Sequence, residues 1–258
     1  MNNCSTNTTA GEWHSLPLCC RYLLLQVVAV AVPVREEGFV RHQMHWGRGV
    51  LADGQCELVG AWVEPTSGAM LWQAFFASLK VRGVDQIRFV AGNEPMDFAS
   101  ALRAGYPDAA VLPSISQVWR ESQIHVVPRH SAVIASGLRR IRRAQSVQHA
   151  HAVLDALEAS AWQACPVAVK RCRSAIEQWR GVYALSMRAR EVVRRAEDSA
   201  EVLQQRICRA LARHGPFESA EAAAAFAELW FVDAESLARR RKLAVVRKSE
   251  LAAASAAA

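Results

Sequence analysis

The sequence lacks any apolar run of the roughly 18 residues that a membrane-spanning helix needs. It holds seven cysteines, but no CxxC pair and no Cys/His cluster with the spacing of zinc ligands. Lysine occurs only at positions 80, 170, 242 and 248, so arginine carries almost all of the positive charge. These absences argue against an integral membrane protein, a zinc-binding module and a disulfide-stapled secreted protein. The cysteine usage fits a reducing, cytoplasmic setting.

The apolar run from Leu23 to Val34 could suggest the core of a signal peptide. However, the first ten residues contain no basic side chain, and no small-residue cleavage site leads into a polar mature start. The run is rich in valine, which favours a buried strand. We therefore expect a protein that is not exported.

Hydrophobic residues make up 52% of the 258-residue chain, which is enough for a packed core and argues against wholesale disorder. The net charge is +7, and it is unevenly spread. Residues 1–128 carry 9 basic and 11 acidic side chains, whereas residues 129–258 carry 22 basic and 13 acidic ones. Guanidinium groups hold phosphate through a planar fork, so an arginine-rich half favours a nucleic-acid partner; codon bias is the alternative source of the arginine preference.

Strand and helix patterns follow one another in a clear order. Strands are predicted over 22–35, 40–51, 56–64, 86–91 and 109–112, with an Asp-Gly hairpin turn at Asp53-Gly54. A helix with Leu71, Trp72 and Phe75 at helical spacing ends near Gly83. Further helices are predicted over 97–105, 116–122, 131–144, 147–164, 167–178, 185–213, 219–231 and 234–246.

This order predicts an α/β protein with a ribonuclease-H-like mixed sheet and flanking helices, followed by a mainly helical carboxyl-terminal half. We divide the chain into a disordered segment 1–12, a sheet core 13–128, a helical region 129–250 and a low-complexity tail 251–258. Pro33 lies inside the first predicted strand, where a missing N–H is a warning against stable folding.

Several strings resemble the bacterial mutator-type transposases, insertion-sequence enzymes with an Asp-Asp-Glu triad. Each string is short, but their order and spacing agree with that family over roughly residues 12–245. They are Val34-Arg35-Glu36-Glu37-Gly38, Ala52-Asp53-Gly54, Leu58-Val59-Gly60, Leu79-Lys80-Val81-Arg82-Gly83-Val84, Ala101-Leu102, Tyr106-Pro107 and Gly215-Pro216-Phe217.

The resemblance implies three acidic positions. The family's first Asp lies seven residues before the Arg of its Val-Arg element, which leads to Val28 here. Its second Asp lies fourteen before a Pro, which leads to Asn93, and its Glu lies sixteen before the Phe of the Gly-x-Phe turn, which leads to Glu201. Only Glu201 is acidic. The family's Cys-x-x-His element likewise falls on Ser114 and Gln117.

In active family members the triad holds two Mg²⁺ or Mn²⁺ ions, which activate the nucleophile and stabilise the leaving oxygen. Val28 offers no ligand atom, and Asn93 offers a neutral carbonyl oxygen. We therefore expect Glu201 alone to bind no metal, we expect no cofactor, and we expect the chain to be inactive in DNA cleavage. Compensation by Glu94 or Asp97 is the alternative.

Family members also carry a DNA-recognising helical region ahead of the catalytic domain. This chain starts almost at the first strand, so we expect sequence-specific recognition of element ends to be missing. Contact with the DNA backbone would instead fall to arginines, for which a solvated helix face is the alternative. The candidates are Arg139, Arg140, Arg142, Arg143, Arg194, Arg206 and Arg209.

Two functions remain open from the sequence. One is a degenerate transposase that binds DNA or associates with a full-length transposase or a second copy of itself. The other is a protein-interaction role with no nucleic acid. Trp119, Trp162, Trp179 and Trp230 could stack on bases, but their apolar helical positions favour core packing.

Overall fold

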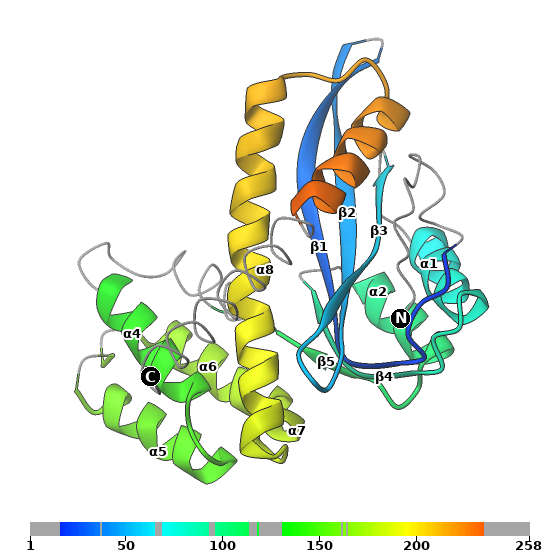
Figure 1. Cartoon of the computed structure of the whole chain (residues 1–258). Helices are drawn as coiled ribbons and strands as arrows, with labels where there is room; N and C mark the ends of the chain where they lie inside the picture. The colour runs from blue at the N-terminus through cyan, green and yellow to red at the C-terminus, as the bar shows by residue number, and fades with distance from the viewer. Residues whose placement is uncertain are drawn as a thin grey trace, which may run out of the picture.

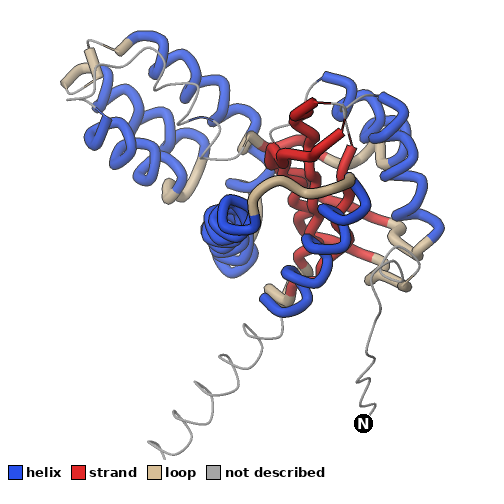
Figure 2. The backbone as a smooth tube through the Cα atoms, turned by 90° about the horizontal axis from the view of Figure 1, so that it is seen from above, coloured by secondary structure: helices blue, strands red, loops and turns tan. Residues whose placement is uncertain are grey.

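The computed structural model describes residues 16–36, 38–64, 69–92, 96–113, 118, 131–160, 162–163 and 165–234. The chain is a mixed α/β protein whose carboxyl-terminal half is mostly helical (Figures 1 and 2). Four predicted segments lie wholly or mostly outside the described residues. They are 1–12, 116–122 apart from Val118, 234–246 apart from residue 234, and 251–258. No helix in the described ranges is both long and apolar enough to span a membrane.

Five strands form one sheet, in the spatial order β3-β2-β1-β4-β5. They are β1 (Arg21–Glu36), β2 (Gly38–Val50), β3 (Cys56–Glu64), β4 (Gln86–Gly92) and β5 (Ala110–Leu112). The first three pair antiparallel, whereas β4 runs parallel to β1 and β5 runs parallel to β4. The expected hairpin joins β2 to β3, and Gly54 takes the positive φ of 89° that its turn requires.

One face of the sheet is covered by α1 (Ala69–Val81) and α2 (Met96–Gly105), which lie side by side in Figures 1 and 2. Aromatic side chains fill this layer, because Trp72 meets Phe98 edge-on at 4.9 Å between ring centroids and Phe75 stacks on Trp62 at 4.7 Å. The aromatic helix predicted from the spacing of Leu71, Trp72 and Phe75 is confirmed.

The opposite face carries α8 (Met187–His214) and a helix over residues 220–234 (Figure 1). Their apolar side chains pack with β1 and β2 in what we call the β1–α8 cluster. Its buried members are Val30, Val32, Val34, Met44, Trp46, Leu58, Ala61, Ala200, Ile207, Leu211, Phe217, Ala223, Ala227 and Phe231.

β1 pairs with β2 along its length, but it pairs with β4 only from Arg21 to Val27. Past that point its outer edge is joined by Phe217, whose N–H donates to the Pro33 carbonyl at 3.0 Å. The N and O of one strand residue face the same side, so the ring nitrogen of Pro33 also faces this outer edge. Pro33 therefore removes no bond from the ladder with β2, and the warning drawn from it does not apply at this position.

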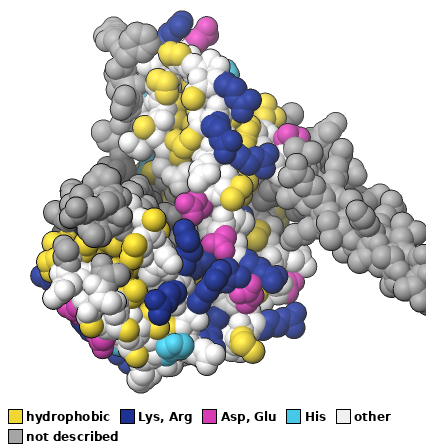
Figure 3. Space-filling model, turned by 90° about the vertical axis from the view of Figure 1, so that its left-hand side faces the viewer, with side chains coloured by type: hydrophobic (Ala, Val, Ile, Leu, Met, Phe, Trp, Pro, Cys, Tyr) yellow, Lys and Arg dark blue, Asp and Glu magenta, His cyan; other side chains and the backbone are white. Residues whose placement is uncertain are grey.

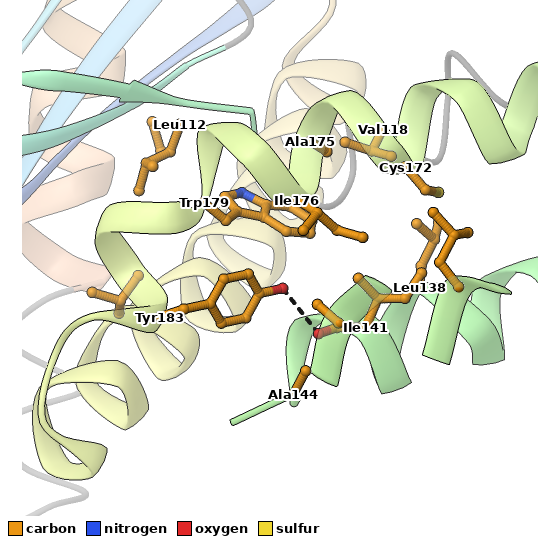
Figure 4. Packing of buried hydrophobic residues seen from close by; sticks show 14 of the residues in the cluster. Leu112, Val118, Leu138, Ile141, Ala144, Cys172, Ala175, Ile176, Trp179 and Tyr183 are labelled. Atoms are coloured by element: carbon orange, nitrogen blue, oxygen red, sulfur yellow. Dashed lines mark hydrogen bonds between the residues drawn. The ribbon is translucent and has the colours of Figure 1, made fainter. Parts of the chain in front are cut away.

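The remaining helices form a bundle against the amino-terminal part of α8. They are α4 (Ser131–Arg142), α5 (Val147–Glu158), α6 (Pro166–Gln178) and α7 (Arg180–Tyr183). Their apolar cluster also contains Phe89 and Leu112 of the sheet, so the bundle and the sheet share a core. Figure 4 shows part of this cluster, in which the Tyr183 hydroxyl donates to the Ile141 carbonyl at 3.0 Å.

The predicted helix 147–164 ends earlier, at Glu158. The Ser160 hydroxyl donates to the Ala156 carbonyl, and the chain then turns so that the N–H of Trp162 reaches the Leu157 carbonyl. This turn buries Trp162 completely. Trp179 is also buried, and its indole donates to the Pro113 carbonyl at 2.9 Å. Core packing is therefore confirmed for both, while Trp119 lies outside the described residues.

Candidate functional site

The position that the resemblance assigns to the first acid lies where β1 leaves the β4 ladder. The last parallel pair is Val27 with Gly92, and Val28 is the next residue on β1. In the sequence, Asn93 directly follows Gly92, but Asn93, Glu94 and the side chain of Asp97 lie outside the described residues. Positions 28 and 93 thus each follow the last paired residue of neighbouring parallel strands, a common location for sites in α/β proteins.

Val28 is half-buried and packs against the β1–α8 cluster. The same cluster contains Ala200, which precedes Glu201 on α8. The fold therefore brings position 28 and the Glu201 turn of α8 to the same apolar cluster between the sheet and the helix. Glu201 is itself exposed.

A two-metal site needs several oxygen ligands around the ions. Among the described residues, no group of three or more His, Cys, Asp or Glu side chains is arranged to hold a metal. Of the two described triad positions, Val28 offers only a hydrocarbon side chain, and Glu201 offers one carboxylate. The described residues therefore do not fit a pair of divalent ions.

The arginines of α4 differ in what they contact. Arg139, Arg140 and Arg143 are exposed. Arg142 is only 13% exposed, and it pairs with Asp198 of α8 at 2.6 Å. Its charge is thus engaged within the protein, whereas the other three face solvent.

The arginines of α8 also divide into two groups. Arg194 lies 3.1 Å from Asp198 and 2.5 Å from Glu191, so acids within the chain hold its guanidinium. Arg206 instead lies over the ring of Trp230 at 5.5 Å. Arg209 is exposed, and its Nε–H donates to the Gln205 carbonyl at 3.2 Å. Figure 3 shows Arg and Lys side chains gathered with acids on this face of the molecule.

Five arginines form one outward stripe along α8: Arg188, Arg195, Arg206, Arg209 and Arg213. Steps of three, four, seven and eleven residues return to nearly the same side of a helix, so these five share one side. All of them except Arg206 are more than a third exposed.

Sequence reasoning missed Glu197. It lies one turn before Glu201, its side chain is 9% exposed, and burial raises its pKa to about 7. Arg142 lies 3.7 Å away and acts in the opposite direction, but burial outweighs it. Nothing in the local sequence distinguishes Glu197 from its exposed neighbours, because its burial depends on the docking of α4.

Residues 3–237 match the sequence model of one protein family, described as transposase, mutator family. The chain belongs to the mutator family of transposases. This confirms the family resemblance, and with it the assignment to transposable elements.

Transposases of several insertion elements are similar to this chain in sequence. The transposase of insertion sequence element ISRM3 from Rhizobium meliloti is 31% identical over 83% of this chain and 54% of its own length. A probable ISRM3-like transposase from Sinorhizobium fredii gives the same values. A probable insertion-element transposase from Corynebacterium diphtheriae is 27% identical over 82% of this chain and 62% of its own length. The chain thus spans about half the length of the ISRM3 relatives.

Proposed function

We propose that this chain acts in DNA transposition as a transposase-like domain that binds DNA but does not cleave it. The observation that carries the proposal is Val28. The resemblance assigns it to the position of the first acid, and its hydrocarbon side chain, which packs against the β1–α8 cluster, offers no ligand atom to a metal.

The proposal includes a ribonuclease-H-like core. Three antiparallel strands followed by two parallel ones, in the order β3-β2-β1-β4-β5, support this fold. In such a core the first acid lies on β1 and the second just after β4, while the third comes from a helix packed beside β1. The positions of Val28, Gly92 and α8 agree with that layout.

Ligand charge gives the chemical reason for inactivity. Three carboxylates contribute a formal charge of −3 to two divalent ions, whereas Val28, Asn93 and Glu201 contribute −1. The two cations would repel each other with too little compensation. We therefore expect Mg²⁺ or Mn²⁺ to bind weakly and to support no strand cleavage.

The test is metal-dependent cleavage of DNA that carries the ends of an insertion element. We expect no turnover by the natural chain and measurable turnover after Val28→Asp and Asn93→Asp together. The matched control is Ala29→Asp with Asn93→Asp, because side chains alternate along a strand and Ala29 faces the other side of the sheet. Clear cleavage by the natural chain would contradict inactivity.

DNA association is proposed from the excess of arginine over acid in residues 129–258 and from the outward stripe of α8. Backbone binding through arginines releases counterions, so affinity should fall steeply as salt rises. Measurement of affinity against salt separates the two remaining functions. No affinity at low salt would leave only the protein-interaction role with no nucleic acid.

A further inference from the structure

A cavity of about 430 Å³ lies where the carboxyl-terminal end of α4 meets α7 and the first turns of α8. Its lining combines apolar side chains, among them Val182, Tyr183 and Val193, with arginines and two glutamates. The cavity therefore offers both charged and apolar surface to a ligand. Val28 and Glu201 do not line it.

Most of the charge around this cavity is already balanced. Arg142 pairs with Asp198 at 2.6 Å and lies 3.7 Å from Glu197. Arg194 pairs with Glu191 at 2.5 Å, and Arg195 shares the same carboxylate at 2.7 Å. Acidic side chains within the protein thus engage these three guanidinium groups.

Two further arginines line the cavity without an acidic partner among the described residues: Arg143 and Arg190. Arg143 is exposed. Arg190 is partly buried and donates from Nη1 to the Gln145 carbonyl at 2.6 Å, a neutral acceptor that leaves its charge uncompensated. The cavity therefore has two surplus positive charges at its rim.

The Nε–H of Arg190 is buried and has no acceptor in the part of the chain that the structure describes. Buried donors without partners are rare in folded proteins, and an ion or water is a common explanation. Because Nη1 is fixed by the end of α4, the guanidinium is held in place before any ligand arrives. A preorganised guanidinium favours a planar or tetrahedral oxyanion.

We propose that this cavity binds a phosphate group through Arg143 and Arg190, and that the phosphate belongs to the backbone of a DNA strand. The source of the phosphate rests on the proposed DNA association. The apolar lining from Val182 and Val193 would receive the attached sugar, which favours a phosphodiester over a bare anion.

The probes are inorganic phosphate and a short double-stranded DNA, each titrated into the full chain at low salt. Arg143→Gln should weaken binding of both probes about tenfold, the loss expected for one charge-assisted hydrogen bond. The matched control is Arg103→Gln, which removes an exposed charge from α2, outside the cavity lining and outside the arginines proposed to contact DNA. Its affinity for phosphate should stay within about twofold of the natural chain.

Arg190→Gln is the second variant, and its unfolding midpoint is measured alongside because Arg190 also holds the Gln145 carbonyl. Equal losses in Arg143→Gln and Arg103→Gln, or no phosphate binding at all, would overturn the cavity as a site. DNA binding that persists in that case would leave the proposed function standing. Phosphate binding without DNA binding would overturn the DNA source and the proposed association instead.

Discussion

Nη1 of Arg142 on α4 lies 3.7 Å from the carboxylate of Glu197 on α8. Burial of this glutamate raises its pKa to about 7, and the nearby charges of Asp198 and Glu201 act in the same direction. The neutral form of Glu197 is therefore favoured in the fold more than in an unfolded chain, where glutamate has a pKa of about 4.3.

This pKa fixes the sign of a pH effect on stability. Between about pH 4.3 and pH 7 the folded chain holds a proton that the unfolded chain has lost. The contribution of Glu197 to the free energy of unfolding is therefore greatest below about pH 4.3, and it is lost as pH rises through about 7. Glu197→Gln should flatten this dependence and raise the unfolding free energy at pH 8 by on the order of 2 kcal/mol. Chemical denaturation of both proteins at several pH values measures it.

Glu191 supplies the control for that series. Its pKa is lowered to about 2 by hydrogen bonds from Arg194 and Arg195, so its contribution is present at neutral pH and is lost only as pH falls. Glu191→Gln should lower stability slightly at pH 8, since the pair is solvent-exposed. A gain in stability in both variants would contradict the assignment of the effect to burial of Glu197.

Gly49 on β2 has no room for a larger side chain. A Cβ at this position would collide with the ring of Tyr22, which is buried and anchored by its hydroxyl bond to Glu57. Gly49→Ala should therefore lower the unfolding free energy by about 1–3 kcal/mol, the usual cost of overpacking. Gly47→Ala is the control on the same strand, because its nearest neighbour would be the Cβ of Val59 at 3.4 Å. Equal stability of the two variants would refute the steric argument.

Arg48 joins the sheet to α8. It is 5% exposed, and its Nη2 donates to Gln26 on β1 at 2.7 Å and to the Ala196 carbonyl at 2.8 Å. Arg48→Met would leave these acceptors buried and unpaired, so we expect a loss of about 2–4 kcal/mol. Arg188→Met, on the exposed side of α8, should change stability by less than about 0.5 kcal/mol. Urea unfolding of the two variants tests the difference.

Much of the fold could be predicted from the sequence because local patterns decide it. Alternation predicted β3 over Cys56–Glu64 with the observed bounds, and Asp53-Gly54 predicted the hairpin before it. Serine caps explain why α5 and α8 begin where they do: Ser146 accepts from the His149 N–H and Ser186 from the Ala189 N–H.

The rest depends on contacts between residues far apart in the chain. Pro33 is tolerated because its ring nitrogen faces the outer edge of β1 and not β2, and Phe217, from after α8, joins that edge through the Pro33 carbonyl. Arg142 belonged to a basic string in the sequence, but its charge is taken up by Asp198 across the α4–α8 junction. Counting along the family's motifs assigned triad positions to Val28 and Glu201, and their segments meet the same apolar cluster. The burial of Glu197, one turn before Glu201, had no local signal.

The outward stripe of α8 makes a prediction about DNA affinity. Arg188, Arg209 and Arg213 are exposed and have no acidic partner in the described ranges. Replacing all three with Gln should reduce the slope of log affinity against log salt by about two to three, since each phosphate contact contributes about 0.9. Folding should be unaffected, because these side chains point away from the β1–α8 cluster.

The comparison variant removes the same charge from elsewhere: Arg21, Arg88 and Arg103 to Gln, all exposed, on β1, β4 and α2. If the net charge of the chain alone determined affinity, both triple variants would weaken DNA binding and lower the salt slope equally. A contact surface along α8 instead requires that only the α8 variant lose slope. Fluorescence anisotropy of a labelled duplex across a salt series distinguishes the two results, and equal slopes would remove α8 as the DNA-facing element.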